Sequence, residues 1–346
     1  MIGGKVNGLD TAETPPSAGF RGYRRVLVQD STIVKLPTWL FPRFSGVSNQ
    51  TSSVCNARIQ AVFDLISARL LDFSIDSYTR NDIAAAPDLG LREGDLVLRD
   101  RGYLSAAEIQ RHLEAGADFI YRHKSGSIYL DASTGEPLDL ADLLERHGSL
   151  DLDVLLSNPE RTRVRLIAQA VDEETANNRR RRARKEMKGH NPSKEVLHLM
   201  GWTIFLTSIP REKAGFTEIL GIYGLRWRIE IIFKSWKSHL NFATIHRVSE
   251  IQLLVMLKAR LLVISALTNM YSLLERVVHD AYGRRISQMK LMGYIAGHMD
   301  RCVRILSFPT ASDEDRRNLV EALVRHCCYD LRRKRHNFSE IMSSLA

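Results

Sequence analysis

The chain has 346 residues, enough for one large domain or two smaller ones with a sizeable core. With 44% hydrophobic and 26% charged residues, it has the composition of an ordinary soluble globular protein. The formal net charge is +9, from 49 Lys and Arg against 40 Asp and Glu, which favours a polyanionic partner. That partner would be nucleic acid or an anionic membrane surface. The alternative, which charge alone leaves open, is a basic protein that has no polyanionic partner.

Zinc-finger, secreted and membrane-spanning proteins are disfavoured. The four cysteines form no CxxC pair and have no zinc-finger spacing, so we interpret them as buried or incidental thiols of a reducing compartment. The N-terminus "MIGGKVNGLD" lacks the apolar run of a signal peptide. The most apolar window, from Leu253 onward, contains Lys258 and Arg260, which indicates a buried amphipathic helix. We therefore expect a cytoplasmic protein with no membrane partner.

The first predicted elements each end at an aspartate. Residues 1–21 are rich in Gly, Pro, Ser and Thr and predict a flexible segment. "RRVLVQD" then predicts a short strand ending at Asp30, and "STIVKLP" leads away from it. Farther along, "LVL" at residues 96–98 predicts a buried strand that ends at Asp100.

A helix and another strand follow Asp100. Ser105 and Glu108 have the spacing of a capping box, and the helix they begin should run to Gly116. "ADFIYRHK" then predicts the next strand. A strand, a helix and a strand in this order indicate an α/β core.

The rest of the chain changes character twice. Short alternating segments and the basic run "NNRRRRARKEMKGHNPSK" predict an insertion, "WTIFLTS" from Trp202 returns as a strand, and the chain is then mostly helical. We therefore predict five segments: a flexible segment, 1–21; the first part of the core with Asp30 and Asp100, 22–124; an inserted β-rich subdomain with a basic arm, 125–201; the second part of the core with Glu230, 202–245; and a helical C-terminal region, 246–346.

The stretch "IYGLRWRIEIIFKSWKSHL", residues 222–240, predicts one helix with two different faces. At about 100° per residue, Tyr223, Arg226, Glu230 and Lys237 fall within an arc of roughly 60°. A separate apolar stripe contains Trp236 and has the width expected for packing on a core.

The polar face of this helix has two interpretations. It is either a functional face or an exposed face with intrahelical ion pairs, Arg226–Glu230 and Glu230–Lys234, each worth only a few tenths of a kcal/mol. The ion pairs alone do not account for Tyr223 or for the two aspartates at strand ends. Gly224 costs about 1 kcal/mol in a helix relative to Ala, which indicates close approach of another group.

These residues resemble a known signature. The spacing Y-x2-R-x3-E-x6-K, formed by Tyr223, Arg226, Glu230 and Lys237, resembles that of DDE transposases of the bacterial insertion-sequence-four group. "QDSTIVKLP" looks like the first acidic motif of that family and "LVLRDRGYLS" like the second. "GWTIFLTSIP" resembles the strand that closes the family's inserted β-rich region, so the likeness extends over roughly residues 22 to 245.

The resemblance implies a fold and a set of catalytic groups. The fold would be an α/β, ribonuclease-H-like mixed sheet with flanking helices, a β-rich insertion before the last catalytic helix, and a helical C-terminal region. Asp30, Asp100 and Glu230 would be the catalytic carboxylates and would hold two divalent cations, Mg²⁺ or Mn²⁺, which take oxygen ligands. Two such cations suit an in-line phosphodiester displacement.

The same resemblance implies how the enzyme would treat double-stranded DNA. Arg226, Lys237 and Tyr223 would contact phosphates. Cleavage would free the 3′ ends of the element, pass through a hairpin and join those ends to target DNA in a cut-and-paste reaction, with a homodimer in the active complex. Trp202 matches the aromatic residue that stacks on a flipped base beside the hairpin; the alternative is that it is a core residue of its strand.

A basic arm from Arg179 to Lys188 has seven basic residues and one acid. It is either a solvated helix face or, in a DNA-processing protein, a phosphate contact whose binding would be steeply salt-dependent. The DNA-binding residues predicted in this arm are Arg180, Arg181, Arg182 and Arg184.

One departure from the family pattern leaves other functions open. Family members usually carry a helical DNA-binding region ahead of the core, whereas Asp30 here follows a short segment. A truncated, non-catalytic DNA-binding remnant that inhibits a full-length transposase is one alternative. A metal-dependent nuclease of the same fold that joins no strands is another.

Overall fold

The computed structural model of the chain describes residues 2–5, 22–46, 54–186, 191–307 and 311–330. The chain forms two compact units, a first unit of residues 1–89 and 225–346 and a second unit of residues 90–224. The predicted α/β class is confirmed, because both units combine strands with helices. The five-segment division made from sequence stays a prediction.

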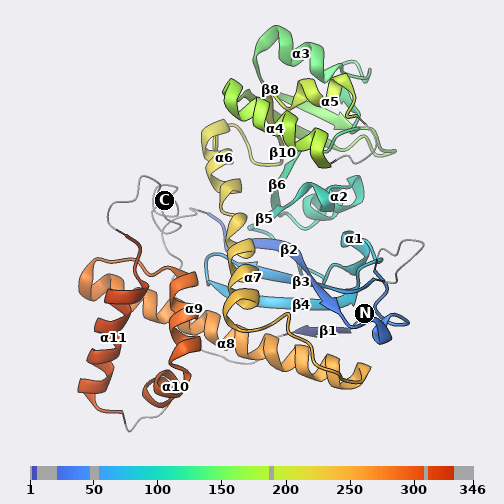
Figure 1. Cartoon of the computed structure of the whole chain (residues 1–346). Coiled ribbons are helices and arrows are strands. Elements are labelled where there is room, and N and C mark those ends of the chain that lie inside the picture. Colours follow the sequence, from blue (N-terminus) through green and yellow to red (C-terminus); the bar gives the residue numbers. More distant parts are fainter. Residues whose placement is uncertain (1, 6–21, 47–53, 187–190, 308–310, 331–346) are drawn as a thin grey trace. The chain divides into compact units, whose positions relative to one another are not determined.

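The sheet of the first unit is an antiparallel meander with one added strand (Figure 1). Its strands lie in the order β1-β4-β3-β2, and every described neighbouring pair is antiparallel. β3 is buried along almost its whole length, as expected for an inner strand covered on both faces. The bounds are β1 (Ile2–Lys5), β2 (Arg25–Leu36), β3 (Cys55–Asp64) and β4 (Arg69–Ser77).

Two sequence predictions change in this sheet. β2 does not end at Asp30 but continues to Leu36, because "STIVKL" pairs in register with β3 and places Asp30 opposite Ala61. Ile2–Lys5, within the predicted flexible segment, forms the strand β1 and pairs with β4. Residues 6–21 of that segment lie outside the described residues.

Helices cover this sheet and extend beyond it. α7 (Trp227–His239) packs against β2, and α8 (Glu250–Tyr282) packs against β4 (Figure 1). A capping box between Ser249 and Gln252 begins α8, and Gly283, with a φ of 60°, ends it. The remaining helices of this unit are η1 (Thr38–Leu40), α1 (Asp82–Ala85), α9 (Gln288–Gly297), α10 (Met299–Ser307) and α11 (Asp313–Cys327).

α8 is the longest of the described helices. Among them it alone is long and apolar enough to cross a membrane by length and composition, and 39% of its most apolar window is buried in the protein. Leu267, Tyr271, Leu274 and Val278 of α8 pack into a core with α9 and α11. α8 thus has the buried face that the sequence predicts.

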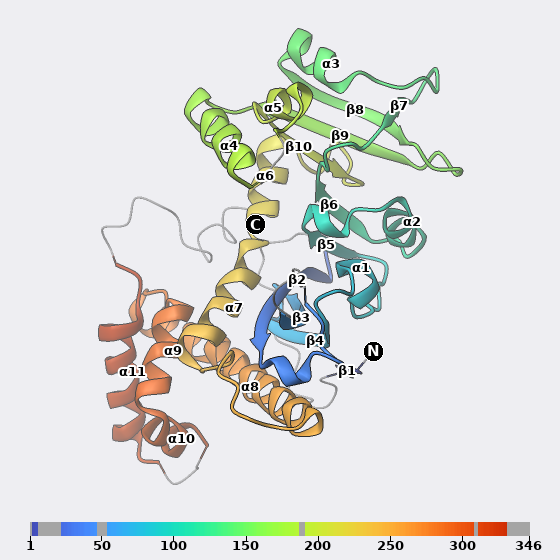
Figure 2. The same cartoon turned by 45° about the vertical axis from the view of Figure 1, so that its right-hand side comes forward.

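The second unit has a sheet with one parallel pair (Figure 2). Its order is β5-β6-β10-β9-β8-β7; β5 and β6 are parallel and the other pairs antiparallel. The crossover helix α2 (Ala106–Glu114) joins the parallel strands, which confirms the predicted strand-helix-strand unit. The strands are β5 (Asp95–Arg99), β6 (Asp118–Arg122), β7 (Tyr129–Asp131), β8 (Ser149–Leu156), β9 (Arg163–Ala170) and β10 (Trp202–Thr207).

The other helices of this unit follow the strands closely. Asp100 separates β5 from η2 (Arg101–Tyr103). The helix α3 (Leu140–His147) packs on β8 (Figure 2). α4 (Glu173–Glu186) and α5 (Lys194–Leu199) lie between β9 and β10 in the sequence. α6 (Phe216–Gly224) ends the unit.

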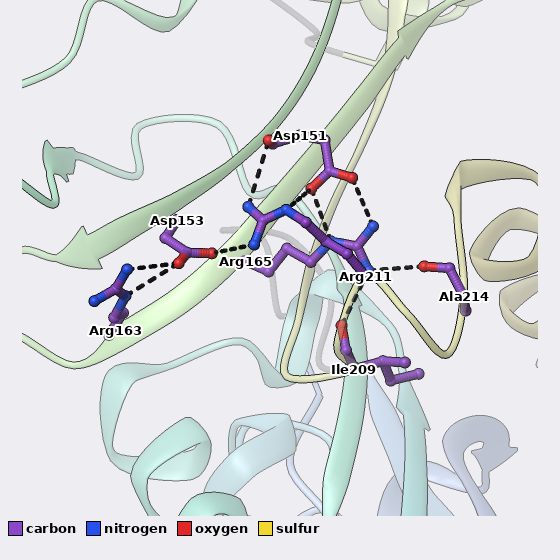
Figure 3. A network of polar contacts seen from close by, with 7 residues as sticks. All are labelled: Asp151, Asp153, Arg163, Arg165, Ile209, Arg211 and Ala214. Atoms are coloured by element: carbon purple, nitrogen blue, oxygen red, sulfur yellow. Dashed lines mark hydrogen bonds and ion pairs between the residues drawn. The ribbon is translucent and has the colours of Figure 1, made fainter.

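A polar network links β8 and β9 to the segment that leads into α6 (Figure 3). The buried Arg165 donates two hydrogen bonds to the Asp151 carboxylate and two to the carbonyl oxygens of Ile209 and Ala214. Arg211 forms ion pairs with Asp151 and Asp153. The hydrogen bonds from Arg165, together with the neighbouring Arg211, lower the pKa of Asp151.

The single helix predicted for residues 222–240 is wrong in one respect. α6 ends at Gly224 and α7 begins at Trp227, with Leu225 and Arg226 in a turn whose carbonyls accept bonds three residues on. A Cβ added to Gly224 would meet no described atom within 4 Å, so close approach does not explain this glycine. The cost of glycine in a helix interior instead favours a break there.

Candidate active site

One arginine joins β2 to α7 through two carboxylates. Arg226 Nη1 donates to Asp30 Oδ2 at 2.9 Å, and Arg226 Nη2 donates to Glu230 Oε1 at 2.6 Å. The Arg226 and Asp30 side chains are mostly buried, 16% and 20% exposed, whereas that of Glu230 is 53% exposed. Asp30 and Glu230 therefore converge on one guanidinium although Asp30 and Arg226 are 196 residues apart in sequence.

This geometry tests the interpretation of the polar face of α7 as an exposed surface with intrahelical ion pairs. The predicted Arg226–Glu230 pair exists, and an i,i+4 pair of this kind contributes about 0.3–0.5 kcal/mol. The bond from Arg226 to Asp30, on a strand, goes beyond what an isolated helix face requires. A carboxylate on a strand and a carboxylate on a helix are brought to one place.

Lys237 is a second link from α7 to the same strand. Its Nζ donates to the carbonyl oxygen of Ile33 at 2.8 Å. Partial burial of the ammonium group lowers the pKa of Lys237. Arg226 and Lys237 thus both contact β2, one near each end of α7.

The donor set suits a hard divalent cation. Asp30 and Glu230 offer carboxylate oxygens, the ligands that Mg²⁺ takes, and they converge on a common cationic group. No group of three or more His, Cys, Asp or Glu side chains close enough to hold a metal occurs among the described residues. Asp100, the third predicted ligand, belongs to the second unit.

Asp100 directly follows β5, as predicted. It is half-buried and precedes η2 without capping that helix through its side chain. Behind it, the buried Arg99 donates to Glu108 of α2 at 2.5 Å. Ser105 caps α2 as predicted, but Glu108 pairs with Arg99 and Arg111 and does not close the predicted capping box.

The pair behind Asp100 is part of a larger buried group. The Tyr121 hydroxyl lies 3.2 Å from His112 Nε2 and 3.5 Å from Arg99 Nη1. Burial, together with the positive charge of Arg99, lowers the pKa of His112 to about 3. This group is not predictable from local patterns, since its one signal in the sequence is a charged residue, Arg99, at the end of an apolar strand.

Tyr223 and Trp202 lie in the second unit. Tyr223 is buried, with its ring 5.0 Å from that of Phe205. Trp202 is half-buried, and its indole nitrogen donates to the carbonyl oxygen of Gly148. Trp202 also lines a pocket with Arg101, Arg122, His123 and Arg179 among the other lining residues.

The described part of the basic arm is helical. Arg181, Arg182 and Arg184 of α4 are exposed. Arg180 is half-buried and bonds to the Leu197 carbonyl and to Glu173. Lys188 lies outside the described residues.

The helix α7 also buries two polar side chains. Arg228 and Ser235 are buried, because α9 packs against α7 and the Arg228 guanidinium lies over the ring of Tyr271 of α8. Trp236 is 1% exposed, which confirms its predicted place in the core.

Comparisons with known proteins identify the class. Residues 22–265 match the family model of the transposase DDE domain. Because this match covers more than half of the chain, the chain belongs to the DDE transposase family, and the predicted family is confirmed.

Particular relatives are transposases of bacterial insertion sequences. The chain is 25% identical over 307 residues to the transposase for insertion sequence element IS231E of Bacillus thuringiensis subsp. finitimus, covering 82% of this chain and 64% of that protein. It is 23% identical over 297 residues to the transposase for IS1151 of Clostridium perfringens, covering 78% of this chain and 62% of that protein. The chain thus spans less than two thirds of the length of these relatives.

A solved structure of piggyBac transposase in a synaptic complex with hairpin DNA is a distant neighbour. It matches with 11% identity and a TM-score of 0.43, covering 91% of this chain and 59% of that one. At this TM-score the likeness adds nothing to the family assignment.

The buried histidine behind Asp100 predicts a loss of stability in mild acid. The pKa of His112 is near 3 in the folded chain and near 6.5 when unfolded, so between these values only the unfolded state takes up the proton. Stability should therefore fall as the pH drops below about 6.5, by about 2 kcal/mol at pH 5 for this one group. Urea unfolding at pH 7 and pH 5 measures the effect.

The matched variants are His112→Gln, which keeps a hydrogen-bonding side chain without the titration, and His246→Gln at an exposed position. His112→Gln should lose about 2 kcal/mol less than the wild type between the two pH values. An equal loss in His112→Gln and the wild type contradicts the assignment.

Proposed function

We propose that the chain is a DNA transposase that cleaves the ends of its own element and joins them to target DNA with the help of two divalent cations. The observation that carries this proposal is the convergence of Asp30 and Glu230 on Arg226. Membership in the DDE transposase family supports it, as do the insertion-sequence transposases among the relatives.

The proposed ligands are Asp30, Glu230 and Asp100. Two cations held there would supply activation of the attacking oxygen and stabilisation of the leaving oxygen in an in-line displacement. Asp30 is held by the strand β2 and Glu230 by the helix α7, so both carboxylates have rigid supports. The Arg99–Glu108 pair fixes the end of β5 from which Asp100 follows.

We also propose that the cationic residues near these carboxylates and on α4 bind the phosphates of DNA. Arg226 offers a planar fork of donors suited to a phosphate, and Lys237 offers a point charge on the same helix. Tyr223 is proposed as a further phosphate contact. The exposed arginines of α4 and Arg180 are proposed to contact the DNA backbone, which would make binding strongly salt-dependent.

The pocket beside Trp202 supports a hairpin step. Arg101, Arg122 and Arg179 give it three cationic side chains, and burial together with Arg101 lowers the pKa of His123 to about 4. We propose that Trp202 stacks on a base flipped out of the duplex, since a flat apolar ring offsets the lost stacking. The reaction would be cut-and-paste with a hairpin intermediate, in a cytoplasmic, nucleoid-associated homodimer.

Loss of the Glu230 charge should slow cleavage strongly. With Mg²⁺ or Mn²⁺ and a labelled duplex that carries the element's ends, Glu230→Gln should cleave about 1,000-fold more slowly than the wild type, because a metal ligand loses its negative charge. Glu145→Gln, at an exposed position of α3, should cleave normally. Gel analysis of the nicked and joined products gives the cleavage rate of each variant and of the wild type.

The same assay separates the rival functions. Nicked and joined products support a transposase, and nicks without joining indicate a nuclease. No cleavage with either metal, and no difference between Glu230→Gln and the wild type, would favour a non-catalytic DNA-binding protein.

Trp202→Ala should slow hairpin formation about 10-fold or more while the first nick is nearly unaffected, because only the hairpin step needs the stacked base. Trp202→Phe, which keeps a flat ring, should recover most of the hairpin rate. Trp39→Ala, at an exposed tryptophan of the first unit, is the control. Equal loss at both steps in Trp202→Ala would instead make Trp202 a residue of the core.

A further inference from the structure

One face of α8 is apolar although it is exposed to solvent. From Val255 to Leu273, every exposed side chain of α8 is apolar. A surface helix ordinarily places polar residues opposite its core face. These residues are Val255, Ala259, Leu262, Val263, Ala266 and Leu273, and the large ones are between 52% and 63% exposed.

This exposed face is distinct from the core face of the same helix. Leu253, Leu257 and Leu261 are fully buried, and Leu267 and Tyr271 pack into the core with α9 and α11. The charged residues between Val255 and Leu273 do not cover the exposed apolar face. Arg260, for example, turns to the carbonyl oxygens of residues 241, 242 and 244 of its own chain. A continuous exposed apolar face of this kind marks an interaction surface.

The spacing on this face is that of a helix pair. Val255, Ala259, Leu262 and Ala266 follow one another at four, three and four residues, the alternation of a coiled-coil seam. The small side chains of Ala259 and Ala266 permit close approach of a second helix. With 33 residues, α8 is about 50 Å long, enough for several turns of contact.

Three pairs of exposed apolar residues are arranged symmetrically about position 264. Ile251 and Val277 are each thirteen residues from it, Val255 and Leu273 nine, and Leu262 and Ala266 two. In a two-fold symmetric pair, residue i of one copy contacts residue j of the other and the reverse. Two antiparallel copies of α8 would therefore match apolar residues at these six positions.

Charges at the ends of the helix favour the antiparallel arrangement. It brings Arg276 of one copy towards Glu250 of the other, and Asp280 towards Arg247, all four being exposed. A parallel arrangement would set each of these charges against its own copy, which is unfavourable. Glu250 also pairs with Arg43 of its own chain, so its carboxylate is held at the end of the helix.

We propose that α8 pairs with α8 of a second copy of this chain in antiparallel orientation through the face from Ile251 to Val277. This pairing gives the proposed homodimer a contact surface. Its test involves no cleavage, so the pairing and the proposed activity can fail separately.

Sedimentation velocity of the whole chain over a range of concentrations tests the pairing. The wild type should form dimers, and Leu262→Glu should weaken the dimer at least about 100-fold, because each copy would bury an unpaired charge near the two-fold axis. Ile128→Glu changes a side chain that is equally exposed, 59% against 58%, on the second unit and should leave the dimer unchanged. A wild type that stays monomeric, or a Leu262→Glu variant that dimerises like the wild type, would overturn the proposal.

Cysteine cross-linking tests the orientation. Mixed Val255→Cys and Leu273→Cys chains should form a disulfide, because the antiparallel pair places these positions opposite one another, within the roughly 7 Å between Cα atoms that a disulfide needs. Each variant alone should not cross-link, and the four native cysteines are buried. Cross-linking of Val255→Cys with itself, or binding of the monomer to anionic phosphatidylglycerol vesicles that Leu262→Glu abolishes, would contradict the antiparallel pair.

Discussion

The bond from Arg226 to Asp30 is the interaction on which the candidate site depends. Two carboxylates close together repel each other, and a shared guanidinium offsets that repulsion. Of the two bonds that Arg226 makes, the one to the exposed Glu230 is worth little by itself, as for most surface pairs. The bond to the mostly buried Asp30 is the one that ties the helix to the strand.

The break between α6 and α7 allows Arg226 to contact the strand β2. Arg226 lies in the turn just before α7, so it can reach β2 while Glu230, one turn later, stays exposed. Lys237 holds the other end of α7 to Ile33. In the second unit, the Arg99–Glu108 pair supports the end of β5 before Asp100. The network of Arg165 with Asp151 holds the segment that leads into α6.

Local patterns predicted much of this chain, and long-range contacts account for what they missed. The βαβ unit, the cap at Ser105, the buried Trp236 and the end of β5 before Asp100 all follow from spacing and turn chemistry. The continuation of β2 past Asp30 depends on pairing with β3, which no local pattern reveals. Arg228 is buried although it is charged, because α8 and α9 cover its side of α7, and spacing within one helix does not reveal such a contact. The position of Glu108 suits a capping box with Ser105 as well as it suits an ion pair with Arg99, so the sequence does not reveal which of the two forms.

Binding of Mn²⁺ to the whole chain, followed by water proton relaxation, tests most directly whether Asp30 and Glu230 form a cation site. The wild type should bind Mn²⁺, and Asp30→Asn should weaken this binding by at least about 10-fold because a hard oxygen ligand loses its charge. Binding by Asp30→Asn and Glu230→Gln that is as tight as in the wild type would show that these two carboxylates hold no metal.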